Sequence, residues 1–353
     1  MVSTAAERRA RILGAVDRLG TVRVIELAAH LGIPVVTLRR DLAALTADGR
    51  LHRSHGVVSS PSRATAEQPE RPPVVGMLVP TVGSYFDEII AGARAASAGA
   101  RLVLGISSYQ ARDDRAQVEH LLGSAVDGLL LSPHWLPGSD SPLDWLADLP
   151  VPAVLIERRG APGAPAVALD TVASDHRHGV LLALRHLAAL GHCAVLLAAR
   201  DDSWTAHQVR AGYAEAVRRL GLDPQPVLDI RDPGAPGEGP GGIERLADRI
   251  AAAAGTGVRA VLVHNDHEAV RLSMLLRARG LRLPEDLALI SYDDVFAALA
   301  APPLTAVAPP RRAVGATAMA LLLRRLEGEA DLPAHRIDLL PELKVRGSCG
   351  AIG

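Results

Sequence analysis

The sequence predicts an α/β protein in which a small winged helix-turn-helix domain precedes a larger, two-lobed domain of parallel sheets flanked by helices. Three observations support this fold class. Residues 1–58 contain three short amphipathic helical stretches followed by a hairpin pattern. Residues 59–73 read SSPSRATAEQPERPP and lack apolar periodicity, which is typical of an extended tether. From Val74 onward, apolar strand-like runs alternate with amphipathic helical stretches, as in parallel sheets.

Size and composition limit the class of protein. With 353 residues, 48% of them hydrophobic, the chain can bury a large core. No run approaches the roughly 20 apolar residues of a membrane span, and the N-terminal MVSTAAERRARIL lacks the apolar segment of an export signal. The two cysteines, Cys193 and Cys349, stand in unrelated contexts. We therefore expect a cytoplasmic protein that associates with no membrane and has no disulfide framework.

Charge is distributed unevenly along the chain. The whole chain has a net charge of −1, but residues 1–58 hold nine arginines against five acidic residues, a net charge of +4. The tether is neutral, so the remainder must be acidic. A basic head on an acidic body indicates a polyanionic partner for the head, although a solvated basic surface is an equally common explanation.

The elements of the head follow from its hydrophobic spacing and its turn residues. Gly20 ends the first helix, and Pro34 suits the first position of the third. We expect helices at residues 5–19, at Ile25–Leu31 and up to about Thr46, with a short β segment at Thr21–Val24 and a hairpin at Arg50–Ser59. A tight turn between the second and third helices, then a hairpin, is the plan of a winged helix-turn-helix.

The third helix is the candidate DNA-reading element. Leu38, Leu42 and Leu45 form its buried stripe. The residues opposite or flanking this stripe are Val36, Thr37, Arg39, Arg40 and Ala43. Guanidiniums bind guanine edges bidentately or contact phosphates. For an isolated Arg-Arg pair, the commoner explanation is a solvated helix face.

The run VTLRRDLAALTADGRLHRSHGVV at residues 36–58 resembles the DeoR-type helix-turn-helix signature in spacing and residue type. The resemblance covers the whole head. It implies that Thr37, Arg39 and Arg40 lie in the recognition helix, while Arg53 and His55 lie in the wing. The family usually has a serine near the helix start, where this chain has Pro34, so one phosphate contact is in doubt.

Aromatic residues give the clearest residue-level indication of function in the body. Seven of the nine aromatics stand at or just after the end of a predicted strand: Tyr85, Phe86, Tyr109, Trp135, Trp204, Tyr292 and Phe296. The strands themselves are expected at 74–80, 102–107, 128–132, 153–157, 167–170, 194–198, 260–263 and 287–292. Ligands bind outside the carboxyl ends of parallel strands, and sugars and purines stack on aromatic faces. The alternative for each residue is burial beneath a helix.

Polar residues follow two of these strands. Asn265-Asp266 ends one strand and Asp293-Asp294 ends another. A carboxylate beside an amide can hold vicinal hydroxyls, whereas the alternative for Asn265 or Asp294 is capping of the next helix. The nearby run His264–Glu268 straddles a strand–helix junction, so its side chains would diverge and we expect no metal site there.

Residues 74–347 resemble the effector domain of the LacI/GalR family. The resemblance rests on VGMLVPTVGSYF near the start, VDGLLLSP at 126–133, RHLAALGH at 185–192, LVHND at 262–266, LPEDLALISYDD at 283–294, PPLTAV at 302–307 and LKVRGS at 343–348. It implies a periplasmic-binding-protein fold within residues 74–349, with three crossovers and dimerisation through the body. We place the N-lobe at 74–172 and 308–327 and the C-lobe at 173–305 and 334–347.

The same resemblance implies roles for individual residues. Tyr85 and Phe86 would form the first wall of the effector site, Trp204 would lie in the loop before a helix, and Asp293 would bind effector hydroxyls. His207 stands where sugar-binding relatives commonly have arginine, so the polarity of the effector is in doubt. The family's usual hinge helix is replaced by a winged head and a Pro-rich tether, which puts coupling by hinge folding in doubt.

The sequence therefore predicts a DNA-binding transcriptional regulator, most plausibly a repressor. Its operator affinity would be controlled by a small sugar-like effector, a sugar or a related polyol or nucleoside. The predicted partners are a double-stranded DNA operator, this effector and a second copy of the chain as homodimer. No catalytic residue, cofactor or metal is assigned. The alternatives are a sugar-binding module without a regulatory role and an α/β enzyme.

Overall fold

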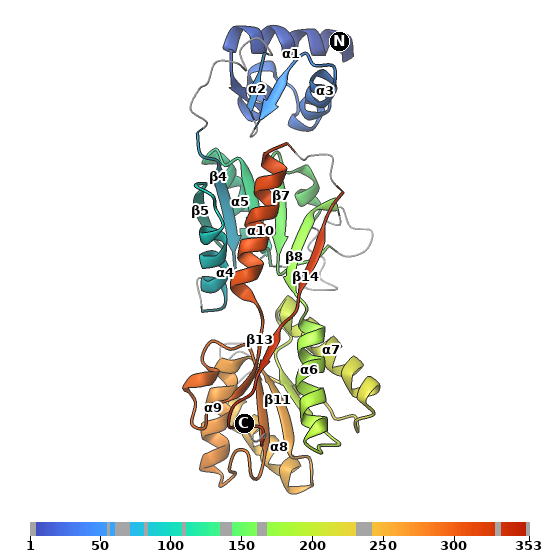
Figure 1. Cartoon of the computed structure of the whole chain (residues 1–353), viewed down its shortest axis with the longest axis vertical. Coiled ribbons are helices and arrows are strands. Elements are labelled where there is room, and N and C mark those ends of the chain that lie inside the picture. Colours follow the sequence, from blue (N-terminus) through green and yellow to red (C-terminus); the bar gives the residue numbers. More distant parts are fainter. Residues whose placement is uncertain are drawn as a thin grey trace.

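The computed structural model describes residues 5–54, 57–60, 71–80, 84–107, 111–134, 143–160, 168–230, 242–328 and 333–350. Three bodies follow one another along the long axis of the molecule (Figure 1): the head, then the N-lobe, then the C-lobe. The N-terminus belongs to the head and the C-terminus to the far lobe.

The head has the predicted winged helix-turn-helix fold. Its elements are α1 (Ala5–Leu19), β1 (Val22–Arg23), α2 (Val24–Leu31), α3 (Val35–Ala47), β2 (His52–Ser54) and β3 (Val57–Ser59). The three strands form an antiparallel sheet in the order β1-β3-β2. Gly32 ends α2 with a φ of 63°, a left-handed conformation that glycine adopts without strain. Arg8 on α1 donates to the buried Asp41 of α3, and this hydrogen bond holds the pKa of Asp41 below its usual range.

The N-lobe contains a sheet of strand order β14-β8-β7-β6-β4-β5. Its strands are β4 (Val74–Val79), β5 (Arg101–Ile106), β6 (Gly128–Leu131), β7 (Ala153–Ile156), β8 (Asp170–Ser174) and β14 (Arg336–Leu339), and every pairing is parallel. The helices of this lobe are α4 (Ser84–Ala95), α5 (Ala111–Gly123), the short 3-10 helix η2 (Leu143–Asp148) and α10 (Arg311–Leu326). The central strands are apolar along their whole length because helices cover both faces.

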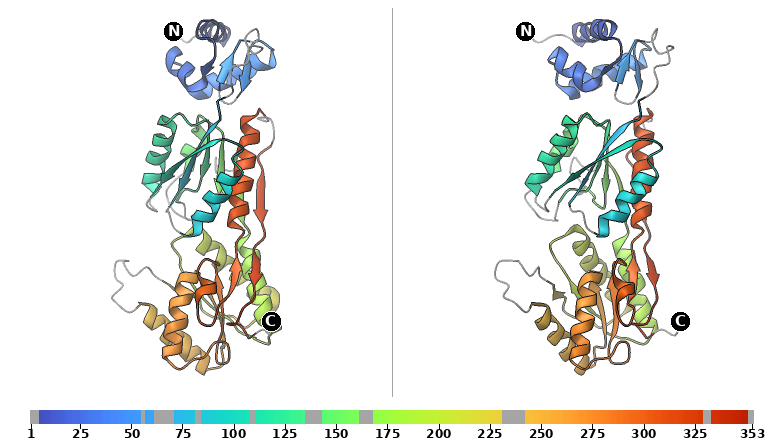
Figure 2. Two further views of the ribbon diagram at one scale, coloured as in Figure 1. Left: turned by 60° about the vertical axis from the view of Figure 1, so that its left-hand side comes forward. Right: turned by 90° about the vertical axis from the view of Figure 1, so that its left-hand side faces the viewer.

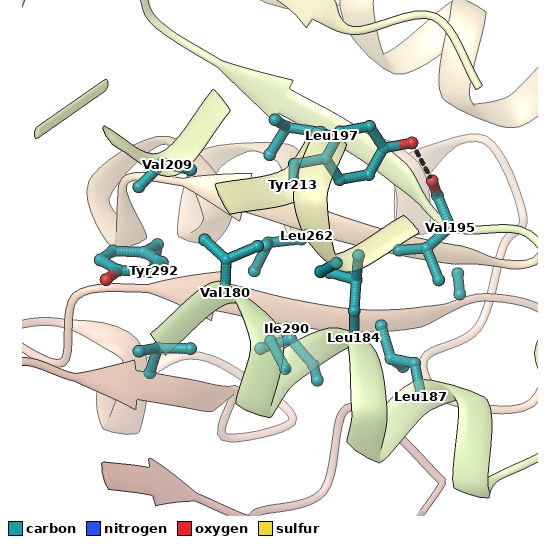
Figure 3. Packing of buried hydrophobic residues seen from close by; sticks show 14 of the residues in the cluster. Val180, Leu184, Leu187, Val195, Leu197, Val209, Tyr213, Leu262, Ile290 and Tyr292 are labelled. Carbon is teal, nitrogen blue, oxygen red and sulfur yellow. Dashed lines mark hydrogen bonds between the residues drawn. The ribbon is translucent and has the colours of Figure 1, made fainter. Parts of the chain in front are cut away.

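The C-lobe contains a second sheet of strand order β10-β9-β11-β12-β13-β15, in which every pairing is parallel except the antiparallel pair of β13 with β15. Its elements are α6 (His176–Ala189), β9 (Leu196–Ala199), α7 (Trp204–Leu220), β10 (Leu228–Asp229), α8 (Gly242–Gly255), β11 (Ala260–His264), α9 (Asp266–Ala278), β12 (Ala288–Tyr292), the 3-10 helix η4 (Ala297–Leu299), β13 (Thr305–Ala308) and β15 (Glu342–Lys344). Figure 3 shows the core beneath α6 and α7, where the Tyr213 hydroxyl donates to the Val195 carbonyl at 2.7 Å.

Three crossovers connect the lobes, as the family resemblance implied. They lie between β8 and α6, between β13 and α10, and between β14 and β15. Figure 2 shows α10 packed along the N-lobe, with the strand that follows it, β14, continuing into β15 of the C-lobe.

Two of the sequence-based boundaries need correction. Residues 334–347 were assigned to the C-lobe, but β14 within this range pairs with β8 in the N-lobe sheet. The reason is packing, because Ile337 and Leu339 contact the N-lobe core. The strand expected at 167–170 begins only at Asp170 and continues to Ser174. Residues 161–167 lie outside the described part of the chain.

Helices α4 and α10 meet at unusually close range through two glycines. A Cβ atom at Gly92 would overlap the carbonyl oxygen of Arg312, and one at Gly315 would overlap the carbonyl oxygen of Ile89. Backbone therefore contacts backbone where the helices cross. This contact fixes the C-terminal helix α10 against the first helix of the N-lobe.

Candidate functional site

A cavity of about 490 Å³ lies between the two lobes, at the carboxyl ends of the parallel strands. Both lobes contribute to its walls. The N-lobe supplies Tyr85, Phe86, His134, Glu157 and Arg158, and the C-lobe supplies Arg200, Asp202, Ser203, Thr205, His264, Asn265 and Asp293. Its size is in the range that holds a small organic ligand.

The structure brings four of the predicted effector residues together. Tyr85 and Phe86 line the cavity from the N-lobe, and Asn265 and Asp293 line it from the C-lobe. Trp204 is buried at the first turn of α7 and does not line the cavity, although its neighbours Ser203 and Thr205 do.

The remaining sequence-based assignments are placed differently or fall outside the structure. His207 is half-buried one turn further along α7 and does not line the cavity. Trp135 and Tyr109 lie outside the described residues. The hypothesis of a ring of aromatics is wrong for Tyr292, which is fully buried in the C-lobe core (Figure 3), where its hydroxyl lies 3.1 Å from Nδ1 of His176.

Sequence reasoning missed the charged residues of the cavity. Glu157 and Arg158 follow β7, Arg200 follows β9, and His264 ends β11. A signal for them was present, because each stands at or just after the end of a predicted strand, where only the aromatic residues and the Asn265-Asp266 and Asp293-Asp294 pairs were considered. His264 was weighed solely as part of a possible metal cluster.

Glu157 is the centre of a buried hydrogen-bond network. Its carboxylate accepts from the hydroxyl of Ser174 at 2.7 Å, the backbone N–H of Ser174 at 3.2 Å and the hydroxyl of Tyr85 at 3.2 Å. It also lies 3.2 Å from Nε2 of His176, whose Nδ1 is 3.1 Å from the Tyr292 hydroxyl. Burial alone would raise the pKa of Glu157, but the bonds from His176 and Ser174 outweigh it and hold that pKa below its usual range.

This network connects the cavity wall to two crossovers. Ser174 and His176 flank the first crossover, so Glu157 joins the effector cavity to the point where the chain passes between lobes. Arg311, just after the second crossover, lies 5.5 Å from the ring centre of Tyr85 and donates to the Asp294 carbonyl at 3.2 Å. The cavity-lining Tyr85 is therefore in contact with Glu157 and Arg311, which connect it to two of the three crossovers.

Asp293 is the most perturbed carboxyl group of the cavity. Its side chain is buried, and Oδ1 has no hydrogen-bond partner among the described residues. Burial, together with the nearby carboxylates of Asp266 and Glu157, raises its pKa to about 7, against the opposing effect of His176 and Arg311. A buried oxygen without a partner is costly, and hydroxyl donors from a ligand would satisfy it.

The C-lobe residues that line the cavity with Asp293 are polar, and the charged ones among them form an ion pair. Burial lowers the pKa of His264 to about 3, so its imidazole is uncharged at physiological pH. Asn265 caps α9 by accepting from the backbone N–H of Glu268 at 3.4 Å, so the capping alternative holds for this residue alongside its place in the cavity. Arg200 pairs with Asp202, and this pairing holds the pKa of Asp202 low despite burial. The set of groups is suited to recognising hydroxyls.

Metal binding has no support in the described part of the chain, which contains no group of three or more His, Cys, Asp or Glu residues placed to hold an ion. Within the same residues, no helix combines the length and the apolar character that crossing a membrane requires.

The exposed face of α3 carries the predicted DNA-reading residues. Val36 is 56% exposed and Arg40 is exposed, while Thr37 is half-buried. Arg39 is also half-buried, and its Nη1 donates to the Leu149 carbonyl of the N-lobe at 3.1 Å. The side chain of Arg53 in the wing, and all of His55, lie outside the described residues.

Comparison with known proteins agrees with this geometry. Residues 8–64 match the model of a DeoR-like helix-turn-helix domain, and residues 184–349 match that of a periplasmic binding protein-like domain. The chain is 30% identical to the HTH-type transcriptional regulator PtxS of Pseudomonas plecoglossicida over 342 residues, covering 93% of this chain and 95% of PtxS.

Two further relatives extend the comparison. The HTH-type transcriptional repressor CytR of Escherichia coli strain K12 is 27% identical over 304 residues, covering 85% of this chain and 86% of CytR. The chain is 26% identical to the transcriptional regulator CelR, whose structure was solved in complex with cellobiose. The match covers 89% of this chain and 90% of the CelR chain, with a TM-score of 0.65. A winged head, a two-lobed body with a cavity between the lobes, and these relatives together show that the chain belongs to the LacI family of DNA-binding transcriptional regulators.

Proposed function

We propose that this regulator is a repressor that binds its operator as a homodimer in the cytoplasm and responds to a sugar-like effector in the cavity between the lobes. The observation that carries the proposal is the cavity between the lobes, which is lined by Asp293, a buried residue whose Oδ1 has no hydrogen-bond partner among the described residues. The names of relatives support it, since CytR is a repressor and CelR was solved with cellobiose. Catalysis is not part of the proposal, because these relatives are regulators.

A ligand screen tests the sensing half of the proposal. Sugars, sugar phosphates and nucleosides would be added singly to the full chain in a thermal-shift panel. A ligand present at 100 times its Kd stabilises the folded protein by about 2.7 kcal/mol, which is readily measured. We expect a member of the polyhydroxylated classes to raise the melting temperature. A flat response to every compound would contradict the proposal that the cavity is a sugar-like effector site.

The variant Arg40→Ala tests the proposed binding of operator DNA by α3. The Arg40 side chain is exposed on α3, so its removal is expected to weaken operator binding about tenfold or more while leaving effector affinity unchanged. Fluorescence anisotropy with an operator duplex measures the change. Arg18→Ala is a charge-matched control, because Arg18 is exposed on α1 away from the reading face. Equal losses in the two variants would show that Arg40 contributes only general charge.

The proposed homodimer has candidate apolar surfaces. Leu104 and Ile106 on the edge strand β5 are 42% and 46% exposed, and Met274 on α9 is 67% exposed. Neighbouring exposed apolar side chains, such as Leu104 and Ile106 on one face of β5, mark association surfaces, whereas a single exposed apolar residue such as Met274 is common on protein surfaces. Sedimentation equilibrium of the full chain is expected to give a dimer mass. A monomer at micromolar concentration would remove the homodimer from the proposal.

A further inference from the structure

The head is not separate from the body, because three of its residues contact one end of the N-lobe. Arg23 donates to the Ala125 carbonyl at 3.0 Å, Arg39 donates to the Leu149 carbonyl at 3.1 Å, and Ile25 packs against an apolar cluster of the N-lobe. We call these three residues and their N-lobe partners the docking contact.

The N-lobe end is suited to receiving arginines. Ala125 lies just beyond the end of α5, and Leu149 lies just beyond the end of η2. Carbonyls at helix ends lack intrahelical partners, and the C-terminal end of α5 carries a partial negative charge. The guanidiniums of the basic head therefore meet carbonyl acceptors at the C-terminal ends of two N-lobe helices. Arg71, at the end of the tether, adds an ion pair to Asp127 beside this surface at 3.1 Å.

The docking contact uses a residue of the DNA-reading helix. Arg39 lies on α3, between the exposed Arg40 and the buried stripe of that helix. A recognition helix enters the major groove, about 12 Å wide, so that the groove walls lie along both of its sides. With Arg39 at hydrogen-bond distance from Leu149, the N-lobe occupies one of those sides.

We propose that the docking contact is autoinhibitory: the N-lobe surface around Ala125 and Leu149 competes with DNA for the head of its own chain. The inference rests on the proposed function, since it requires that α3 reads DNA. It goes beyond that function by assigning the N-lobe a direct part in controlling DNA affinity. The head must leave this surface before Arg39 can reach DNA.

Variants that weaken docking without touching α3 test the proposal. Arg23→Ala removes the bond to Ala125 and one positive charge. Arg11→Ala is its charge-matched control, because Arg11 bonds only to the Leu31 carbonyl within the head among the contacts that the structure describes. In anisotropy with a duplex enriched from random sequences, Arg23→Ala is expected to bind about five times more tightly than Arg11→Ala. Equal or weaker binding by Arg23→Ala overturns the proposal.

A body-side variant excludes effects on the head itself. Leu149→Ser leaves the head and the Leu149 carbonyl intact but removes an apolar side chain from the N-lobe cluster on which Ile25 packs, so it is also expected to bind DNA several times more tightly than the wild type. Small-angle scattering of the same variants without DNA is expected to show an increased radius of gyration. An unchanged radius together with unchanged DNA affinity overturns docking. If the wild type and all variants bind no duplex at low salt, the proposed function fails, whereas DNA binding that is equal in all of them refutes only the autoinhibition.

Discussion

Asp293→Asn is expected to make the protein more stable at pH 8 while removing most of its effector affinity. The carboxyl group is buried with a pKa of about 7, against a usual value of 3.8, so its ionised form costs folding energy above neutrality. A shift of that size corresponds to an upper limit of about 4 kcal/mol, and we expect a gain of about 2 kcal/mol because asparagine also leaves polar atoms to satisfy.

The sign of the pH dependence follows from the raised pKa. Between about pH 4 and pH 7 the folded protein binds a proton at Asp293 that the unfolded chain releases, so this group stabilises the fold less as pH rises through that window. Urea titrations at pH 5 and pH 8 measure the effect. The wild type is expected to lose more stability between these values than Asp293→Asn does.

Asp294→Asn is the matched control for stability. Asp294 forms an ion pair with Arg346 at 2.8 Å. Asp294→Asn removes the negative charge from this pair and is therefore expected to destabilise the protein. If Asp293→Asn destabilised the protein at pH 8 as Asp294→Asn does, the account of an unsatisfied buried carboxylate would be wrong.

Asp293→Asn is also expected to weaken effector binding, because hydroxyl groups donate stronger hydrogen bonds to a carboxylate than to an amide. Hydroxyl groups of a ligand donate to the carboxylate and favour its ionised form, so wild-type effector affinity is expected to rise between pH 6 and pH 8. Asparagine removes the charge, which is expected to lower affinity about tenfold to a hundredfold and to abolish the pH dependence. Calorimetric titration at three pH values measures both. A variant with unchanged affinity would place the effector elsewhere in the cavity.

Gly315→Ala is expected to destabilise the N-lobe by about 3 kcal/mol. The added methyl group would overlap the carbonyl oxygen of Ile89 on α4, and a backbone atom cannot rotate out of the way. Overpacking of this kind forces the helices apart, which exceeds the gain of up to about 1 kcal/mol that alanine brings to a helix. Denaturant unfolding followed by circular dichroism measures the loss.

Gly123→Ala is the control within the same lobe. Gly123 is also helical, at the end of α5, but a Cβ there would meet nothing within 4 Å. Its replacement is expected to be neutral or to stabilise the protein by a few tenths of a kcal/mol. If the two glycine variants behaved alike, the close approach of α4 and α10 would not limit the stability of the lobe.

Local patterns predicted the fold closely where apolar spacing and turn residues agree. In the head, the stripe of Leu38, Leu42 and Leu45 and the stop at Gly32 placed α3 within two residues of its ends. In the body, the edge strands were harder to predict from the sequence. β14 has only four residues, and exposed side chains alternate with half-buried ones along it. Its sequence therefore does not indicate which sheet it joins, because contacts with residues distant in the chain determine that.

The site was predictable in its location and less so in its composition. Asn265 and Asp293 follow from their place after parallel strands, which is a local property. Whether an aromatic at a strand end faces the cavity or the core depends on the register of the strand. Tyr292 and Asp293 are adjacent, yet the first is in the core and the second in the cavity. The docking contact could not be predicted, because it joins residues more than 100 positions apart.

The crossing of α10 over α4 also has a consequence for biosynthesis. Both the helix and the strand that complete the N-lobe come from residues 311–339, whereas the rest of that lobe is translated before residue 175. A ribosome adds about 5–20 residues each second, so the nascent N-lobe waits for on the order of ten seconds with the partner surfaces of α10 and β14 uncovered. During this interval the apolar surfaces that α10 and β14 later cover are exposed, and a chaperone that binds apolar segments would protect them.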